Sequence, residues 1–512
     1  MLRKLLSLLH NKIFIVTLLI LIQLLVFFTI VFKVSEYFVA IYFILIALSF
    51  GISIYIINKN DNPTYKLTWV LLIMTVPVFG GLIYILFGGQ KVPKELRKRD
   101  MEAEEIYQEV LWQNAKIMEE LEEQDPVAYK QANYLWKNAM YPIYNHTETS
   151  FFPIGEDKFK AMVEELKKAE KFIFLEYFII APGIMWDTIL DILIQKVKEG
   201  VEVRVLYDDA GCITTLPQDY CATLHRLGIK AKVFNPIKPR LAMQMNNRDH
   251  RKILVIDGKV GMTGGINLAD EYINKKERFG HWKDCSVMLK GEAVWNLTLM
   301  FLQFWNYDEA EKDNVFDFKC DVKEFENISN DGYVQPYSDS PTDEENVGEY
   351  THINMINAAN HYVYATTPYL VIDNEMKTAL VLAAKNGIDV RILVPHIPDK
   401  WYVFAVTRSN YRDLIEAGVK IYEYTPGFVH GKTFVVDDKM AVVGTVNMDY
   451  RSYYLHYECG VWFYRSKVVM DVKKDYLETL EKSHLVTLEE CKQVRLPVRI
   501  MRAILNLFSP MM

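Results

Sequence analysis

Two segments of the chain carry the same polar and glycine residues at the same spacing, H-x-K-x4-D-x6-G-[GT]-x-N. The first copy consists of His250, Lys252, Asp257, Gly264, Gly265 and Asn267. The second consists of His430, Lys432, Asp437, Gly444, Thr445 and Asn447. A single histidine near a lysine means little, but positions that agree in register throughout indicate two copies of one phosphate-handling unit that face each other.

The residue types restrict the chemistry of this unit. Imidazole can attack phosphorus or donate a proton, whereas the lysine ammonium and the asparagine amide donate hydrogen bonds to phosphate oxygens. A metal site would use histidines with several carboxylates or thiolates, and a lysine beside each histidine would repel the cation. The motif therefore predicts a metal-free site. Its expected catalytic residues are His250, Lys252, His430 and Lys432, and its expected phosphate-binding residues are Asn267 and Asn447.

The two motif aspartates have a second interpretation. Asp257 and Asp437 complete the motifs and are counted with the catalytic positions. Each nevertheless ends a hydrophobic run and is followed by Gly258 or Asp438, residues typical of turns. These positions favour a structural role for both carboxylates.

Composition limits the class of protein. The chain has 512 residues, which is enough for membrane segments and two domain-sized halves. Its formal net charge of −7 argues against a general nucleic-acid binder, whose phosphate contacts need a basic surface. The six cysteines have no C-x-x-C spacing, which indicates reduced residues of a cytoplasmic domain.

Three apolar runs lie near the N-terminus. Residues 13–32 and 37–57 contain no charge, and each has about the ~20 residues that cross a bilayer as a helix. The third run, residues 67–87, holds Pro77 and Gly80, which can kink it or leave it as a re-entrant or interfacial element. Basic residues flank the three runs, so the positive-inside rule predicts two full spans and a cytoplasmic catalytic domain.

The remaining chain repeats a strand and helix pattern. Residues 101–124 are charge-rich and are interpreted as a solvated spacer helix. After them, strands are expected at residues 171–180, 201–207 and 230–234, and again at residues 362–367, 388–394 and 419–424. The predicted fold class is therefore α/β, with two pseudo-symmetric halves that share one active site behind N-terminal transmembrane helices.

These patterns divide the chain into six parts. The parts are a membrane anchor at residues 1–90, a linker helix region at 91–150, a first half at 151–315, a connection at 316–347, a second half at 348–484 and an amphipathic segment at 485–512. An insertion at about residues 237–246 is either a plain surface loop or a lipid-facing lip. In the last part Arg495, Arg499 and Arg502 alternate with apolar residues, which predicts a basic helix that lies in an anionic interface or packs on the body.

The duplicated motifs resemble the paired HKD motifs of the phospholipase D superfamily, and further matches resemble the bacterial cardiolipin synthases. The matching runs are Asn246-Asn247-Arg248-Asp249-His250-Arg251-Lys252-Ile253, Thr367-Pro368-Tyr369 and Asn447-Met448-Asp449-Tyr450-Arg451-Ser452, with Glu458 beyond them. The similarity extends from the membrane segments to Phe508-Ser509-Pro510. It departs at Asp249, where the family more often has Asn, and at Ser340, where it often has Gly.

The resemblance implies a two-step reaction that needs no cofactor. His250 would form a phosphohistidine while His430 acts as general acid and then base, although the two roles can be exchanged. Glu458 and Asp284 would orient the histidines. Arg251, which has no counterpart in the second motif, would bind a second phosphate or pair with an acid.

The implied protein is a multi-pass enzyme of the bacterial inner membrane. As a cardiolipin synthase it would transfer a phosphatidyl group from one phosphatidylglycerol to another and release glycerol. Its partners would be phosphatidylglycerol and anionic membrane lipid, without nucleic acid. The alternatives are a phospholipase D-type hydrolase, another phosphatidyltransferase, and a scaffold that only binds lipid head groups.

Overall fold

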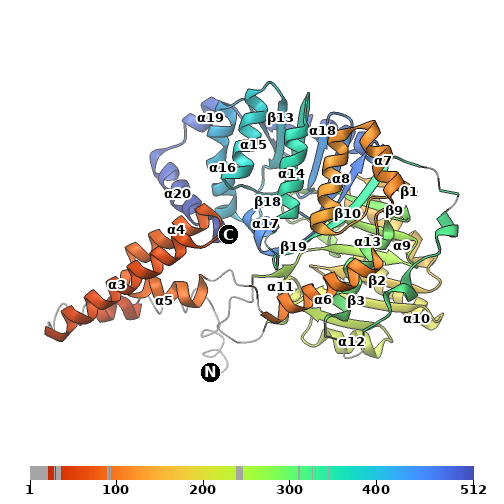
Figure 1. The fold of residues 1–512 in the computed structure, drawn as a ribbon, viewed down its shortest axis with the longest axis horizontal. Helices are drawn as coiled ribbons and strands as arrows, with labels where there is room; N and C mark the ends of the chain where they lie inside the picture. The colour runs from red at the N-terminus through yellow and green to blue at the C-terminus, as the bar shows by residue number, and fades with distance from the viewer. Residues whose placement is uncertain are drawn as a thin grey trace. The chain divides into compact units, whose positions relative to one another are not determined.

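The computed structural model describes residues 21–27, 29, 36–88, 92, 94–237, 246–308, 312–325, 327–328, 330–343 and 345–511. They divide into an N-terminal unit, drawn from Met1–Lys91 and Ile237–Met245, and a body, drawn from Val92–Pro236 and Asn246–Met512. Figure 1 shows the helices of the N-terminal unit and the two sheets of the body. The predicted span at residues 13–32 and the insertion at residues 237–246 lie mostly outside the described residues.

One helix of the N-terminal unit is long and apolar enough to cross a membrane. Helix α3 (Glu36–Asn58) covers the second predicted span, and its stretch Ile41–Asn58 meets the requirement. Among the residues described above, no other helix does. The described residues therefore contain one candidate N-terminal membrane helix, and a second full span stays a prediction.

The third apolar run forms two short helices. Helices α4 (Pro63–Thr75) and α5 (Pro77–Phe87) are separated at Val76, because the residue before a proline avoids the helical conformation. Each is shorter than the ~20 residues that a span requires. Glycine allows them to pack closely, since a Cβ at Gly80 would lie 2.6 Å from Ile73 Cα.

The body contains two mixed sheets with the same strand order. The order is β1-β9-β7-β6-β2-β3-β4 in the first half and β10-β19-β17-β16-β11-β13-β14 in the second, where β20 (Ser483–Leu485) extends the edge. Strands β2, β3 and β4 run parallel, and so do their counterparts β11, β13 and β14. The two predicted α/β halves are thus present, and their equivalent strands occupy equivalent places.

The predicted strands correspond to real ones with small shifts of their ends. The first sheet consists of β1 (Thr147–Phe152), β2 (Phe172–Tyr177), β3 (Glu202–Asp208), β4 (Lys230–Phe234), β6 (Lys252–Ile256), β7 (Val260–Gly264) and β9 (Ser286–Gly291). The second consists of β10 (Tyr333–Asp339), β11 (Tyr362–Thr366), β13 (Asp389–Pro395), β14 (Lys420–Tyr424), β16 (Thr433–Val436), β17 (Met440–Gly444), β19 (His456–Tyr464) and β20.

Helices cover the faces of both sheets (Figure 1). All six residues of β2 are buried, with Phe172 and Phe174 in one core and Ile173 and Leu175 in another, as expected for a strand packed on both faces. The helices are α8 (Pro126–Ala139), α9 (Gly155–Lys167), α10 (Ile184–Lys198), α11 (Asp209–Cys212), α12 (Tyr220–Arg226), α13 (Val294–Trp305), α14 (Val347–Ala358), α15 (Asn374–Lys385), α16 (Trp401–Glu416), α17 (Tyr450–Tyr454) and α18 (Lys467–Leu480).

The predicted connection at residues 316–347 contains strand β10. This strand pairs antiparallel with β19 at the edge of the second sheet. Its Pro336 lacks a backbone N–H, which an edge strand tolerates because its outer side makes only an isolated bridge, between Val334 and Tyr144. The sequence did not predict this strand, because a polar segment that contains proline is also typical of a loop. Likewise, β1 begins before the predicted start of the first half at residue 151.

The region after the N-terminal unit is not a solvated spacer helix, so that interpretation is wrong. It forms α6 (Lys94–Val110) and α7 (Ala115–Gln124), and the chain breaks between them. Helix α6 packs on the body, where the buried Tyr107 hydroxyl donates a hydrogen bond to Leu299 O at 2.6 Å. The sequence of α6 is rich in charge and therefore gave no indication of its apolar face, which is covered by α13.

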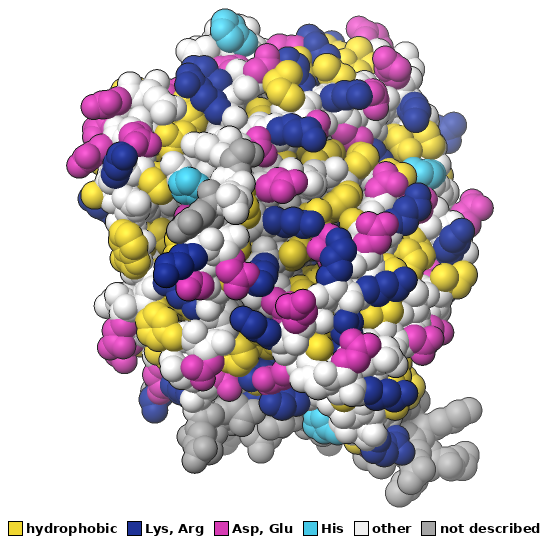
Figure 2. All heavy atoms as spheres, turned by 90° about the vertical axis from the view of Figure 1, so that its right-hand side faces the viewer, with side chains coloured by type: hydrophobic (Ala, Val, Ile, Leu, Met, Phe, Trp, Pro, Cys, Tyr) yellow, Lys and Arg dark blue, Asp and Glu magenta, His cyan; other side chains and the backbone are white. Residues whose placement is uncertain are grey.

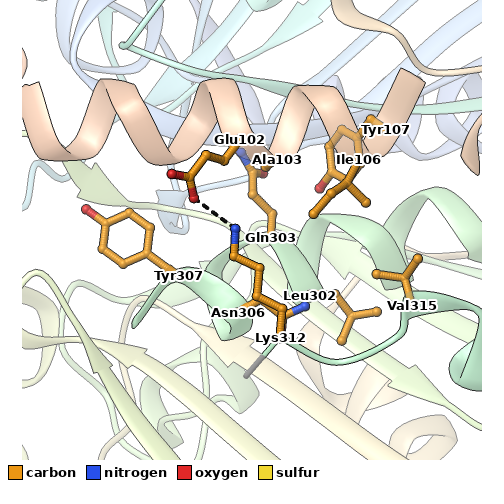
Figure 3. A pocket seen from close by; sticks show the side chains of 10 residues that line it. All are labelled: Glu102, Ala103, Ile106, Tyr107, Leu302, Gln303, Asn306, Tyr307, Lys312 and Val315. Carbon is orange, nitrogen blue, oxygen red and sulfur yellow. Dashed lines mark hydrogen bonds and ion pairs between the residues drawn. The ribbon is translucent and has the colours of Figure 1, made fainter. Parts of the chain in front are cut away.

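Figure 3 shows a pocket where α6 lies against α13. An ion pair of 2.8 Å between Glu102 and Lys312 lies across it. None of the motif residues lines this pocket.

The C-terminal segment forms α19 (Leu488–Lys492) and α20 (Leu496–Leu507). Leu505 packs against the cluster that includes Val403 and Val406 of α16. Ile500 and Ile504 are exposed. Helix α20 therefore packs on the body with one side and presents apolar side chains on another.

Candidate active site

Two pairs of short strands join the halves. Strand β5 (Arg248–Asp249) of the first half pairs in parallel with the start of β19, and β8 (His281–Lys283) pairs in parallel with β15 (Gly427–Val429) of the second half. The motif histidines come next along these pairs. The His250 N–H donates to Tyr457 O at 2.9 Å, and the His430 N–H donates to Lys283 O at 2.6 Å. The structure thus brings both motifs together where the halves meet.

Each histidine is hydrogen bonded to a carboxylate of the other half. His250 Nδ1 lies 2.9 and 3.0 Å from the two carboxylate oxygens of Glu458, and His430 Nδ1 lies 2.6 Å from Asp284 Oδ2. Both carboxylates are buried, and Glu458 also accepts a hydrogen bond from Ser452 Oγ at 2.7 Å. A carboxylate can only accept, so it holds the imidazole proton on Nδ1 and leaves the lone pair on Nε2.

Burial controls the charge of the imidazoles. Desolvation lowers the pKa of His250 well below its ordinary value, and the charges of Lys252 and Lys432 lower it further. Desolvation and Lys432 lower the pKa of His430 to about 4, although Asp284 opposes the shift. Both histidines are therefore neutral near pH 7 in the free protein. A bound phosphate would offset the lysine charges and favour protonation of one imidazole.

The motif lysines are buried beside the histidines. Lys252 Nζ donates to the carbonyl oxygen of His250, and Lys432 Nζ donates to that of His430. Desolvation lowers the pKa of each lysine to about 8, while the nearby carboxylates oppose the shift. At neutral pH most of the positive charge remains and can stabilise a phosphoryl group in transfer.

The motif asparagines differ from each other. The side-chain oxygen of Asn267 accepts a hydrogen bond from the Ile179 N–H at 3.0 Å, and its NH2 group donates to Tyr272 Oη at 2.8 Å. Asn447 is buried, and its Oδ1 has no hydrogen-bond partner among the described residues. Asn447 is therefore the less constrained candidate for phosphate binding.

The motif aspartates hold the ends of two strands. Asp257 accepts three backbone N–H groups from residues 170–172 at 2.7–2.8 Å, and Asp437 accepts three from residues 360–362 at 2.6–2.9 Å. Both have positive φ, 55° and 52°, as turn residues do. Asp257 follows the end of β6 opposite to Lys252. The structure thus places both carboxylates on backbone amides, in the arrangement that their turn positions favour.

Arg251 pairs with an acid. It is fully buried, its Nε donates to Glu176 Oε1 at 2.7 Å, and its guanidinium lies 3.8 Å from the ring centroid of Phe304. Asp249 belongs to the same cluster, 3.4 Å from Arg251 Nε, and desolvation raises the pKa of this carboxyl group. The unusual Asp249 therefore lies in a buried ion cluster beside the motif.

His456 is a site residue that the sequence did not reveal, because a lone histidine has no spacing signal. Its ring centroid lies 5.5 Å from that of His250, and its Nδ1 lies 3.7 Å from Glu458 Oε1. These three side chains place possible metal ligands within 4.8 Å of one another, the one such set in the described parts of the chain. The charges of Lys252 and Lys432 oppose a cation there.

Figure 2 shows how charged side chains are distributed over one face of the molecule. Basic and acidic side chains alternate over this face, with apolar side chains between them.

Comparisons with known proteins agree on the family. A family model described as "Cardiolipin synthase, PLD-like domain" matches residues 162–280 and 352–480, and one described as "Phospholipase_D-nuclease N-terminal" matches residues 47–89. An uncharacterised protein of Streptococcus mutans is 47% identical over 90% of this chain and 100% of its own length. A cardiolipin synthase of Alkalihalophilus pseudofirmus is 37% identical over 90% of this chain and 92% of its own.

A solved structure supports the fold. The crystal structure of phosphatidylserine synthase from Haemophilus influenzae aligns with a TM-score of 0.56 and 14% identity, over 74% of this chain and 99% of that one. Fold and motifs thus define a phospholipase D superfamily protein with two α/β domains. Within that superfamily, the chain belongs to the cardiolipin synthase-like family.

Proposed function

We propose that this chain is a cardiolipin synthase that transfers a phosphatidyl group from one phosphatidylglycerol to another and releases glycerol. The observation that carries the proposal is the pair of neutral histidines, each held at Nδ1 by a carboxylate of the other half and flanked by a buried lysine. Relatives named cardiolipin synthase, which match about nine-tenths of the chain, support the choice of lipid.

In the first step, the Nε2 lone pair of His250 attacks phosphorus. The P–N bond forms and the P–O bond to the glycerol head group breaks. His430, which is protonated at Nε2 once the bound phosphate offsets the lysine charges, gives this proton to the departing oxygen. Lys252 and Lys432 offset the negative charge on the phosphoryl oxygens. Glu458 stabilises the positive charge that develops on His250, because it contacts Nδ1 directly.

In the second step, a hydroxyl of another phosphatidylglycerol attacks the phosphohistidine. His430 takes the hydroxyl proton, the new P–O bond forms and the P–N bond to His250 breaks. Two phosphatidylglycerols then give one cardiolipin and one glycerol. The near-symmetric site also permits the opposite assignment, in which His430 is the nucleophile. The mechanism uses no cofactor or metal.

The proposed enzyme is a multi-pass protein of the bacterial inner membrane, with its body in the cytoplasm. The apolar helix α3 and the basic residues that flank the apolar runs support this arrangement. The spans would keep the body at the surface from which both lipid substrates are drawn.

The test is incubation of the purified protein, reconstituted in vesicles, with phosphatidylglycerol as the sole substrate lipid. Cardiolipin and glycerol in equal amounts are the expected products. Phosphatidic acid in place of cardiolipin would identify a hydrolase. No turnover, with the protein still folded, would favour a lipid-binding scaffold or a different donor lipid.

A further inference from the structure

His456 is a buried polar group that the mechanism above does not use. It lies on β19 and is 9% exposed, and neither of its ring nitrogens has a hydrogen-bond partner among the described residues. Its Nδ1 is 3.7 Å from Glu458 Oε1, which is beyond hydrogen-bond distance. Buried polar groups in native proteins are nearly always satisfied, so an unpartnered imidazole next to the reacting histidine suggests a ligand contact.

The neighbours of His456 determine what it can bind. Desolvation lowers its pKa to about 4, so the ring is neutral, with one N–H and one lone pair. The carboxylate of Glu458 faces Nδ1 and favours the proton there, since an anion attracts the N–H dipole. Nε2 then carries the lone pair and acts as an acceptor. Phosphoryl oxygens only accept, so they are poor partners for Nε2, whereas a hydroxyl group is a suitable one.

We propose that Nε2 of His456 accepts a hydrogen bond from a hydroxyl of the lipid head group whose phosphate reacts at His250. The site would thereby select polyol head groups over those without a hydroxyl. This inference rests on the proposed transfer reaction and adds the group that recognises its head group. The short distance between the two rings, 5.5 Å between centroids, places His456 within reach of a head group attached to that phosphate.

The test compares release of the head group from phosphatidylglycerol and from phosphatidylpropanol, which has the same phosphate but no head-group hydroxyl. The wild-type chain should prefer phosphatidylglycerol by about tenfold or more in kcat/KM. His456→Phe should slow only the reaction of phosphatidylglycerol and bring the ratio near one. His456→Gln, which keeps an acceptor, should restore much of the preference.

His352→Phe is the matched control. This buried histidine stacks on Phe434 with a centroid separation of 4.0 Å, and it should leave the ratio unchanged. An unchanged ratio in His456→Phe, or an equal loss with both substrates, would overturn the assignment. Failure of the proposed function would look different, because the wild-type chain would then release no glycerol from phosphatidylglycerol.

A different observation concerns the rim of the site. Trp401 is 64% exposed, and Tyr402 and Ile397 are also exposed, in the segment that follows β13. Lys400 of this segment is close enough to His250 for its charge to lower the pKa of that histidine. The Tyr369 hydroxyl donates to Asp399 Oδ2 at 2.6 Å, which holds the segment at the catalytic edge of the sheet.

Helix α20 continues this surface. Its Leu505 packs beside Val403 and Val406 of α16, so the end of α20 lies near the start of α16. Its exposed Ile504 precedes Leu505, and Arg499 and Ile500 are exposed about one turn earlier in the helix. Exposed aromatic, aliphatic and basic side chains together are typical of proteins that enter an anionic bilayer interface.

We infer that residues 397–402 and α20 form one surface that inserts into the interfacial region of an anionic bilayer beside the active site. A bilayer is the favoured occupant because the surface combines apolar side chains with Lys400 and Arg499, which complement anionic head groups. The inference depends on the proposed function only for the identity of the lipid. Contact of this surface with the chain's own N-terminal helices is the competing outcome.

The test is photolabelling of the full chain in phosphatidylglycerol vesicles that contain a lipid with a photoreactive group in its acyl chain. Adducts should form on the peptide with Trp401 as well as on α3. Trp401→Gln should lower the initial rate about fivefold or more at a low mole fraction of phosphatidylglycerol, and less when this lipid is abundant. The control is Trp112→Gln, because Trp112 is 68% exposed and lies outside this surface. This variant should change neither the photolabelling of the Trp401 peptide nor the initial rate.

Adducts on α3 without any near Trp401 would overturn the inference, as would cross-links from this segment to α3 in place of lipid. Equal rate losses in Trp401→Gln and Trp112→Gln would do the same. Labelling requires no turnover, so its result is independent of whether the protein makes cardiolipin.

Discussion

Replacing Glu458 by Gln is expected to slow transfer by roughly 10- to 150-fold. The side chain keeps its shape, but the group that contacts His250 Nδ1 at 2.9 Å loses its charge. A hydrogen bond to a charged group contributes about 1.5–3 kcal/mol, and about 1.4 kcal/mol corresponds to a tenfold rate change. Ser452→Ala is the control. This variant removes a 2.7 Å hydrogen bond to Glu458 but keeps the charge of the Glu458 carboxylate, so it should slow transfer by about fivefold or less.

Asp284→Asn should slow transfer by a similar factor, but through a different proton-transfer step, because Asp284 contacts His430. If His430 protonates the departing oxygen, a phosphodiester with a p-nitrophenyl leaving group should largely rescue Asp284→Asn, since that group departs without a proton. Glu458→Gln acts through His250 and should be slow with both substrates. The assay follows glycerol release from phosphatidylglycerol and nitrophenolate release from the synthetic diester.

The pattern of rescue tests the exchange of carboxylates between the halves. Equal losses by both variants with both substrates would refute the reasoning, because each carboxylate would then serve both steps alike. Rescue of Glu458→Gln in place of Asp284→Asn would keep the exchange and assign His430 as the nucleophile. Thermal unfolding of each variant should confirm that the loss is not one of folding.

Three further outcomes are expected. Activity should survive treatment with EDTA, whereas a loss that one particular metal restores would overturn the metal-free mechanism. Asp257→Ala removes three hydrogen bonds to backbone amides and should lower the free energy of unfolding by about 2–4 kcal/mol, with kcat of the folded fraction within about threefold of wild type; a large loss of kcat at full stability would give this carboxylate a catalytic role. Each buried histidine should contribute a loss of stability as pH falls below about 6.5, because the unfolded chain then binds a proton that the buried imidazole does not. The pKa of His352 is lowered to about 3 by burial, so His352→Phe should remove about 2 kcal/mol of the stability lost between about pH 7 and 5 in denaturant titrations, and an unchanged pH dependence would contradict this.

The repeated strands were predictable because each is an apolar run with a local signal. Strand β4 has the bounds that its pattern predicts, and β11 and β14 differ from their predictions at one end. Local patterns did not reveal β10, whose proline and polar residues fit an edge strand as well as a loop. They also did not distinguish a solvated α6 from one that buries Asp100 and Tyr107, because the partner surface lies far away in the sequence.

The site was predictable in its residues but not in its pairing. The duplicated motif and the family resemblance pointed to both histidines and to the carboxylates Glu458 and Asp284. That each carboxylate serves the histidine of the other half depends on the pairing of β5 with β19 and of β8 with β15. These strands are too short to have a pattern of their own, and their partners are distant in the sequence. His456 was missed because no spacing marks a single histidine.

The central claim is that two histidines, one from each half, act as a single catalytic pair. Its most direct test is the turnover of His250→Ala and His430→Ala in phosphatidylglycerol vesicles, with the folding of each variant verified. We predict that each variant alone reduces cardiolipin formation to near background, because neither half of the pair can complete both steps. If either variant keeps more than about a tenth of the wild-type rate, a loss below about 1.4 kcal/mol, the two-histidine account is wrong.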